Sequence, residues 1–339
     1  MVTGMPISAE VLANVKADRI RRVSDLANRR SREKSGRFLI EGPQSVREVV
    51  AWHPDVVRDL YVQAGDASDG SHDGFANQTI AAIAQAALDS DIYVHRATRE
   101  VMTRISSDAQ GIAAVGDLTA MRDAMRFDGV SSHGASANDS PVRDASSHDT
   151  SVEDAAERDA HDGGADDGSV RGISGPFVAA FWQVRDPGNA GTVIRAADAA
   201  GCDAVVFVDD CVDVFNPKVI RSTAGSLFHL PVVSMTTGGF FDRARADGVR
   251  VIAADVYGTD DRKPELLPDV LAERSGTRRI TDDPHGDAIL FGNEARGLPR
   301  DVLKRCDRIV SIPLYGKAES LNLGTSAAVM LMSLAMARR

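Results

Sequence analysis

Short apolar runs alternate with stretches of helical period along most of the chain, most regularly after residue 175. The runs typical of buried strands there are 177–184, 204–208, 230–233, 251–254, 288–291 and 308–311. The stretches typical of helices are 190–200, 217–224, 240–247 and 320–337. Strands that alternate with helices predict a parallel sheet with helices on both faces. Ligands of such a sheet bind beyond the carboxyl ends of its strands.

The N-terminal part predicts a smaller α/β domain. The expected strands are 38–40, 60–62, 92–94 and 111–115. One helix is expected to open at Gly42-Pro43, and another to cover 80–88. We place this domain at 15–120 and the larger one at 175–339.

Residues 128–170 differ in composition from both domains. They hold eleven acidic residues and two arginines, a balance of 2 − 11 = −9 in a chain whose net charge is −10. They contain no Leu, Ile, Met, Phe, Tyr or Trp, so they cannot bury enough apolar surface to offset the entropy lost on ordering. We expect a disordered acidic linker over 128–172, whose histidines, His133, His148 and His161, bind no metal.

The sign of the charge reverses between Lys16 and Arg37. This stretch holds nine basic and three acidic residues, a balance of 9 − 3 = +6. A surface that binds the phosphate backbone of a nucleic acid has this character. An ordinary solvated helix face has it too, and composition alone leaves both readings open.

Composition also narrows the class of protein. With 43% hydrophobic residues among 339, the chain can build a core in each of two domains. Its three cysteines, Cys202, Cys211 and Cys306, are too few for a disulfide framework, and no Cys/His spacing indicates zinc. The first twenty residues lack the order of a signal peptide, and polar residues interrupt the uncharged stretch near the C-terminus. We therefore expect a cytoplasmic protein without a metal or a membrane span.

Three turns that follow predicted strands carry the candidate chemistry. The first, 185–195, puts Gly188-Asn189-Ala190-Gly191 at a helix start, where small residues allow a ligand to approach closely. The second, 292–299, places glycines on both sides of a lone carboxylate, Glu294. The third, 312–323, runs from Ile-Pro through a glycine to Glu319-Ser320-Leu321-Asn322 at the start of an apolar helix.

Each turn also has a more ordinary explanation, and for the second it is simply a turn rich in helix-starting residues. Helix capping accounts for much of the first turn, and Glu319 with Ser320 is expected at a helix start in any protein. Asn322 fits capping less well, because we expect it inside the helix. A dinucleotide-binding fold is a rival for the first turn, with Asp209 as the ribose-binding acid, although the glycines lack the GxGxxG spacing.

Taken in order, the three turns resemble the motifs of the SpoU (TrmH-type) branch of the SPOUT RNA methyltransferases. Those motifs are Asn-x-Gly with an Arg six positions after the Asn, Gly-x-Glu-x-x-Gly-Leu, and Ile-Pro…Gly-x-x-Glu-Ser-Leu-Asn. The resemblance continues through Asn216-Pro217-Lys218, Arg221-Ser222 and Gly225, and spans 175–337. One departure is Gly324, where the family often has serine. Residues 32–42 are similar to the family's accessory RNA-binding domain, which has a ribosomal-protein-like fold.

The resemblance implies an α/β protein with a C-terminal SPOUT domain, tied in a deep trefoil knot, that binds S-adenosylmethionine and forms a homodimer. The implied cofactor-binding residues are Gly292, Gly297, Ile312, Gly316 and Leu321. The implied catalytic residues are Asn189, Arg195, Glu294, Ser320 and Asn322. With an RNA-binding domain implied around the basic stretch, its RNA-binding candidates are Arg29, Arg30, Arg32, Lys34 and Arg37.

The implied reaction transfers a methyl group to a ribose 2′-hydroxyl of RNA, with ribosomal RNA favoured over transfer RNA. Family proposals make Arg195 the base, but a guanidinium almost never deprotonates in a protein. We hypothesise that Arg195 instead clamps an RNA phosphate and stabilises the developing alkoxide. Asn189, Ser320 and Asn322 would orient the ribose and the cofactor, while Glu294 would organise the active-site turns or Arg195.

Two rival functions remain open at this point. An NAD-dependent oxidoreductase would use the first turn and Asp209, but it leaves Glu294 and residues 319–322 without a role. A non-catalytic RNA-binding module would need only the basic N-terminal half.

Overall fold

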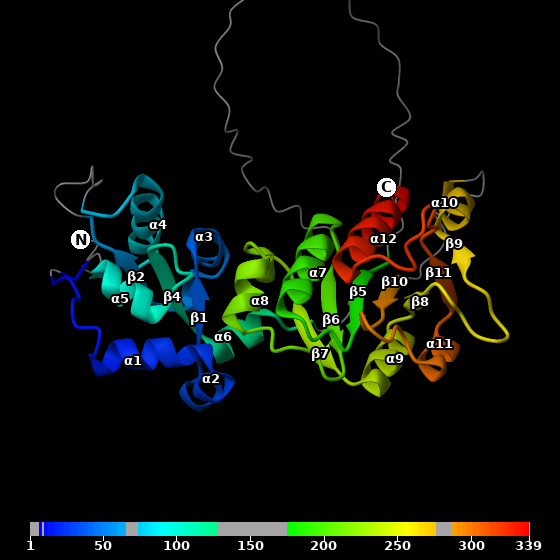
Figure 1. The fold of residues 1–339 in the computed structure, drawn as a ribbon, viewed down its shortest axis with the longest axis horizontal. Helices are drawn as coiled ribbons and strands as arrows, with labels where there is room; N and C mark the ends of the chain where they lie inside the picture. The colour runs from blue at the N-terminus through cyan, green and yellow to red at the C-terminus, as the bar shows by residue number, and fades with distance from the viewer. Residues whose placement is uncertain (1–6, 9, 66–73, 128–174, 276–285, 339) are drawn as a thin grey trace, which may run out of the picture.

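The computed structural model describes residues 7–8, 10–65, 74–127, 175–275 and 286–338, which form two α/β domains side by side (Figure 1). The segment for which we expect a disordered acidic linker, 128–172, lies outside the described residues, together with its three histidines.

The N-terminal domain is built on a four-stranded sheet in the order β1-β4-β2-β3. Its strands are β1 (Arg37–Glu41), β2 (Val57–Gln63), β3 (Val94–Ala97) and β4 (Ile112–Asp117). Its helices are α1 (Asp18–Ser24), α2 (Arg29–Ser35), α3 (Pro43–Trp52), α4 (Gln78–Asp89), α5 (Arg99–Ile105) and α6 (Leu118–Ala124). The expected strands are confirmed, except that the third begins at Val94 instead of residue 92. The sequence patterns did not predict the short helices α1, α2, α5 and α6.

Alternation along β1 explains why this sheet is covered on both faces. Phe38 and Ile40 point into the core shared with α3 and α4, whereas Leu39 points into a second cluster with α1 and α5. Both sets are fully buried, so each face of the sheet has its own apolar contacts.

The C-terminal domain contains a parallel sheet of seven strands in the order β7-β6-β5-β10-β8-β11-β9. Its strands are β5 (Phe177–Trp182), β6 (Ala204–Val208), β7 (Val232–Met235), β8 (Arg250–Ala254), β9 (Glu265–Leu266), β10 (Asp287–Phe291) and β11 (Arg308–Ser311). Its helices are α7 (Pro187–Ala199), α8 (Pro217–Ser222), α9 (Thr237–Ala246), α10 (Leu267–Ser275), α11 (Arg300–Arg305) and α12 (Leu323–Arg338). The parallel sheet predicted from the sequence is confirmed, although β9, α10 and α11 were not expected.

Helices cover both faces of this sheet, as predicted. Buried residues of α7, α8 and α12 belong to one apolar cluster, and those of α9 and α11 belong to the cluster on the opposite face. β10 lies between β5 and β8, although β8 precedes it in the chain. No helix in the described ranges has both the length and the apolar content to cross a bilayer.

Charged contacts join the two domains beside α8. Arg221 Nη1 lies 2.6 Å from Glu41 Oε1 and 2.6 Å from Asp108 Oδ2. His229 Nε2 lies 3.2 Å from Glu48 Oε2, so a second contact crosses the same interface. Glu41 is almost fully buried, and an unpaired carboxylate there would be costly. Arg221, a motif residue in the sequence, therefore serves to join the domains.

The carboxylate of Asp287 ties together three elements at the amino end of the sheet. Asp287 begins β10 and is fully buried. Its carboxylate lies 2.8 Å from Arg250 of β8, 3.0 Å from Arg274 of α10 and 3.0 Å from Arg338 of α12. Because these arginines come from separate elements, the carboxylate anchors two helices to the sheet.

We predict that Asp287→Asn destabilises the C-terminal domain by about 3–5 kcal/mol, because it leaves buried guanidinium groups without their counter-charge. Urea denaturation measures the loss, followed by the fluorescence of Trp182 in a Trp52→Phe background that silences the tryptophan of the N-terminal domain. The control is Asp242→Asn, which removes an exposed carboxylate 3.5 Å from Arg245 and should change stability by no more than about 0.5 kcal/mol. Equal urea midpoints for the two variants would contradict the anchoring role.

Candidate functional site

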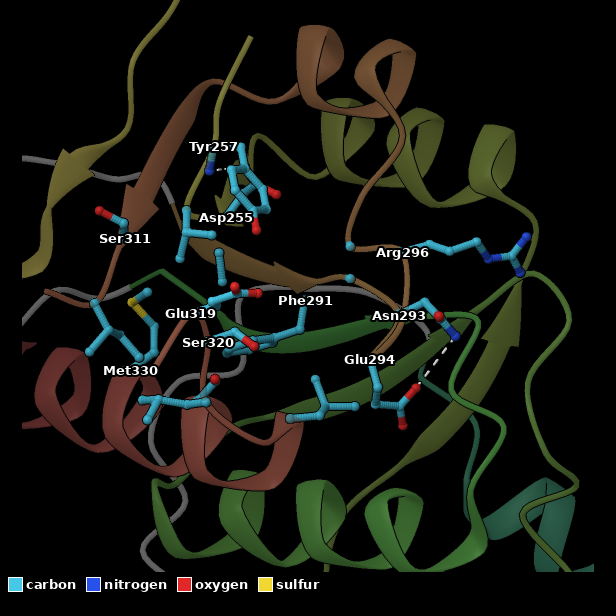
Figure 2. Close-up of a pocket in the computed structure, with 18 of the residues that line it drawn as sticks. Asp255, Tyr257, Phe291, Asn293, Glu294, Arg296, Ser311, Glu319, Ser320 and Met330 are labelled. Atoms are coloured by element: carbon cyan, nitrogen blue, oxygen red, sulfur yellow. Dashed lines mark hydrogen bonds between the residues drawn. The ribbon is translucent and has the colours of Figure 1, made fainter. Parts of the chain in front are cut away.

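A pocket of about 340 Å³ lies at the carboxyl edge of the parallel sheet, where β8, β10 and β11 end (Figure 2). Phe291, Val310 and Met330 contribute apolar surface to its lining. The polar lining residues include Asp255, Glu294, Arg296, Glu319 and Ser320. The pocket thus combines an apolar surface with several fixed polar groups, as small-molecule sites do.

The second motif forms a tight turn directly after β10. Asn293 and Gly297 exchange two backbone hydrogen bonds, of 3.2 Å and 2.8 Å. A Cβ atom on Gly292 would stand 2.4 Å from the carbonyl carbon of Gly297, and Gly297 itself has a φ of +63°. Both positions therefore need glycine, which leaves the backbone of the turn open to the pocket.

Asn189 joins the first motif to the second. Asp186 caps α7 by accepting a hydrogen bond of 2.8 Å from the backbone N–H of Asn189, and this cap fixes the first turn of the helix. The Asn189 side chain donates from Nδ2 to Glu294 Oε1 at 2.9 Å and accepts at Oδ1 from Asn322 Nδ2 at 3.2 Å. The three turns therefore meet in the structure, because Asn322, Asn189 and Glu294 form one hydrogen-bonded chain.

Asn322 occupies a different position from the one expected. α12 begins at Leu323, so Asn322 precedes the helix and caps it instead of lying in its interior. Its Oδ1 accepts hydrogen bonds from the N–H groups of Gly324 at 2.8 Å and Thr325 at 3.4 Å. Gly324 has a steric explanation, since a Cβ there would stand 2.5 Å from Thr192 Cγ2 on α7. Close packing of α12 on α7 therefore accounts for the departure from serine.

Asn293 is a site residue that the sequence analysis did not select. It is buried, and its Nδ2 donates to the carbonyl oxygen of Gln183 at 2.8 Å and lies 3.4 Å from Glu294 Oε2. Gln183 follows β5 with a φ of 52°, a left-handed conformation that turns the chain towards Asn293. Asn293 thus fixes the turn that carries Glu294. The sequence signal that could have identified Asn293 is an amide side chain directly after Gly292, the glycine that follows β10.

The structure brings most of the predicted site residues to one edge of the sheet. Glu294 and Ser320 line the pocket, while Asn189 and Asn322 are bonded beside it. Among the expected cofactor-binding residues, Gly292, Gly297, Ile312 and Leu321 line the pocket and Gly316 does not. Arg195 lies exposed on α7, outside the pocket lining, and its guanidinium makes no hydrogen bond or ion pair with any other described residue. The roles of these residues stay predictions.

The basic stretch divides into exposed and buried members. Arg29, Arg30, Lys34 and Arg37 are exposed, as an RNA-binding role requires. The prediction for Arg32 is wrong, because only 3% of this residue is exposed. Its guanidinium donates to the carbonyl oxygens of Leu26 at 2.8 Å and Ala27 at 2.9 Å and pairs with the carboxylate of Asp213. Arg32 is therefore a structural link between the domains.

Asp209, the acid on which the dinucleotide reading rested, is already engaged within the protein. Its carboxylate accepts hydrogen bonds from Trp182 Nε1 at 3.0 Å, from Thr237 N at 2.7 Å and from Thr237 Oγ1 at 2.6 Å. Partial burial opposes ionisation of Asp209, but these hydrogen bonds outweigh it and lower the pKa of the carboxyl group. Asp209 thus holds the start of α9. Within the described residues, no cluster of His, Cys, Asp and Glu could hold a metal ion.

Known proteins match both domains. Residues 176–332 match the SpoU rRNA Methylase family, and residues 17–114 match the MRM3-like substrate binding domain. The chain is 40% identical over 151 residues to the 23S rRNA (guanosine(2553)-2′-O)-methyltransferase RlmP of Bacillus subtilis. The aligned region is 44% of this chain and 54% of that protein. The chain is 33% identical over 157 residues to a 23S rRNA (uridine(2479)-2′-O)-methyltransferase of Streptomyces viridochromogenes, covering 43% and 47% respectively. The matches span about half the length of these relatives.

Solved structures share the fold over almost the whole chain. An AdoMet-bound rRNA methyltransferase from Sinorhizobium meliloti has a TM-score of 0.63 at 20% identity, with 96% of each chain covered. An RNA 2′-O ribose methyltransferase also has a TM-score of 0.63, at 23% identity, with 96% of this chain and 98% of the other covered. The C-terminal domain thus matches the SpoU rRNA Methylase family over residues 176–332, and the solved structures share the fold of the whole chain.

Proposed function

We propose that this protein transfers a methyl group from S-adenosylmethionine to a ribose 2′-hydroxyl of ribosomal RNA. The observation that carries the proposal is the hydrogen-bonded chain of Asn322, Asn189 and Glu294 beside the strand-end pocket. The names of the relatives, two of which are 23S rRNA 2′-O-methyltransferases, support ribosomal RNA over transfer RNA. The AdoMet bound to a protein of the same fold supports the choice of methyl donor.

The pocket suits this donor in size and charge. A volume of about 340 Å³ lies at the lower end of the range for small-molecule sites. Three carboxylates, those of Asp255, Glu294 and Glu319, line it together with one guanidinium, that of Arg296. The negative excess favours a sulfonium cation, and Phe291 and Met330 offer apolar surface to a purine ring.

The polar chain can position the acceptor ribose. When bound, S-adenosylmethionine supplies the electrophilic methyl group, and holding the reactants in line can contribute roughly 7–11 kcal/mol. Asn189 is bonded through both ends of its amide, so its orientation and that of Glu294 are set in advance. Arg195 is exposed and unengaged among the described residues, which leaves its guanidinium available to clamp an RNA phosphate.

We predict that Asn189→Ala lowers kcat for methyl transfer about 100-fold, because the acceptor loses its alignment. The assay uses the whole protein, tritiated S-adenosylmethionine, and ribosomal or transfer RNA from cells that lack the gene, followed by mapping of 2′-O-methylated nucleotides. S-adenosylhomocysteine should bind the variant with unchanged affinity, and Gln85→Ala on α4 is the control for a lost surface amide.

The outcomes of this assay separate the rival functions. Methylation of transfer RNA alone would contradict the proposed target. RNA binding without methyl incorporation would favour the non-catalytic module, and binding of a nicotinamide nucleotide in place of S-adenosylhomocysteine would favour the oxidoreductase.

We further propose that the exposed cations of the basic stretch bind the RNA backbone. Replacing Arg30, Lys34 and Arg37 together by alanine should lower the slope of log Kd against log salt concentration by about 2 to 3, because each phosphate contact contributes about 0.7 to 0.9. Filter binding at several salt concentrations measures the slope, with Arg245→Ala on α9 as the control. An unchanged slope would show that these side chains are only a solvated surface.

α12 supports the proposal of a homodimer. Val329 is 38% exposed, Met332 38% and Met336 68%, and their spacing places them on one side of the helix. The other side of α12 is buried against α7 and the sheet through Ala327, Leu331 and other apolar residues. A helix that is apolar on all sides is normally buried against other protein surfaces. We propose that a second copy of the chain packs against the exposed side of α12.

We predict that Met332→Glu converts the homodimer to a monomer, since it places a charge in the apolar contact. Light scattering after size-exclusion chromatography gives the mass, and Gln85→Glu on α4 should leave it unchanged. A wild-type protein that is monomeric at micromolar concentration would contradict the proposal.

Two other properties are proposed with this function. The insertion of β10 between β5 and β8 supports a trefoil knot of the kind that the family resemblance implies.

The cytoplasm is the proposed compartment, because ribosomal RNA is the proposed substrate and the three cysteines are unpaired.

A further inference from the structure

Asp255 stands next to the glycine turn of the pocket, on the neighbouring strand. β8 and β10 pair in parallel with Ala254 opposite Phe291, so the residues that follow them, Asp255 and Gly292, come next to each other at the sheet edge. The N–H of Asp255 donates to the carbonyl oxygen of Val310 at 3.1 Å, which holds it against β11 as well. Asp255 therefore lies between the turns that follow β10 and β11, and Figure 2 shows it at the pocket.

The Asp255 carboxylate has one fixed oxygen and one open oxygen. Oδ1 accepts hydrogen bonds from the N–H groups of Tyr257 at 2.8 Å and Gly258 at 2.7 Å. Oδ2 lies 3.6 Å from the position that a Cβ would take on Gly297, so it faces the glycine turn. None of the described residues donates a hydrogen bond to Oδ2. The carboxylate is thus held in place with an acceptor directed at the pocket.

The other carboxylates of the pocket differ from Asp255 in this respect. Glu294 is bonded through Oε1 to Asn189, and its Oε2 lies near Asn293. Glu319 is exposed in the segment before α12, and no described residue fixes its side chain. Among the three carboxylates of the pocket, Asp255 is therefore the one that combines a fixed side chain with an oxygen available to a ligand.

We infer that Asp255 binds the ribose of the methyl donor, accepting hydrogen bonds from the 2′,3′-diol through Oδ2. In nucleotide-binding α/β folds, a glycine turn admits the ligand at one strand end, and an acid at the end of another strand of the same parallel sheet accepts from the ribose hydroxyls. The pair of Gly292 and Asp255 has this layout. The inference rests on the proposed function, because it takes S-adenosylmethionine as the ligand.

The test compares two ligands on Asp255→Asn. The asparagine keeps an Oδ1 acceptor for the N–H groups of Tyr257 and Gly258, so the turn is preserved, but an NH2 group replaces Oδ2. Isothermal titration calorimetry with S-adenosylhomocysteine and with 5′-methylthioadenosine, which has the diol but no amino acid part, should give a Kd about tenfold higher for both. Asp260→Asn, in an exposed pair with Arg300, is the matched control and should change neither Kd.

A further ligand isolates the diol. 2′,3′-Dideoxy-5′-methylthioadenosine, which lacks both hydroxyls, should bind the wild type about tenfold more weakly than 5′-methylthioadenosine. It should lose little more on Asp255→Asn, because both changes remove the same contact. Additive losses would overturn the inference. So would a loss confined to S-adenosylhomocysteine, which would assign Asp255 to the amino group, or equal Kd values for variant and wild type. A wild type that binds S-adenosylhomocysteine while Asp255→Asn binds it equally well refutes this inference alone, whereas a wild type that binds none refutes the proposed function.

Discussion

Parallel pairing of β5, β10, β8 and β11 is the constraint on which the rest of the site depends. Strands that run in one direction end at one edge, so the segments that follow them are neighbours although they are far apart in the sequence. Asn189 and Glu294 are 105 positions apart, and Asn322 and Asn189 are 133 apart, yet their side chains are bonded to one another. Short loops at the strand ends then need only a few hydrogen bonds to fix these groups.

The same sheet also determines how stability and chemistry are distributed. The amino end of β10 carries the buried carboxylate of Asp287, and its carboxyl end leads into the turn with Glu294. Charge pairs among buried groups hold the first end, whereas small residues and amides shape the second. One strand therefore connects the anchor of α10 and α12 to the pocket, and residues at the far edge of the sheet help to place the site.

Much of the fold could be predicted because the central strands are continuous apolar runs. β6 begins and ends where its pattern does, at Ala204 and Val208. β9 escaped prediction because its two residues are exposed and carry no apolar pattern. The start of α12 was placed too early, since Ser320 and Leu321 continue an uncharged stretch and conceal the cap at Asn322.

Site residues could be predicted where neighbouring residues in the sequence determine their role. They could not be predicted where the role depends on a partner far away in the sequence. The strand-end glycines and amides identified the pocket. Arg32 looked like its exposed basic neighbours, because nothing near it in sequence indicates Asp213, 181 positions away, as its partner. Asp255 has no neighbouring motif, and its position became evident only from the pairing of β8 with β10.

Asn322 uses both ends of one short side chain, and this restricts which residues can replace it. Its oxygen caps α12 and its nitrogen donates to Asn189. Aspartate or serine would cap a helix equally well. Aspartate, however, has no hydrogen to give, and the single serine hydroxyl is too short to serve both partners. The stability of α12 and the position of Asn189 therefore depend on the same amide, so laboratory evolution has little room to change one without the other here.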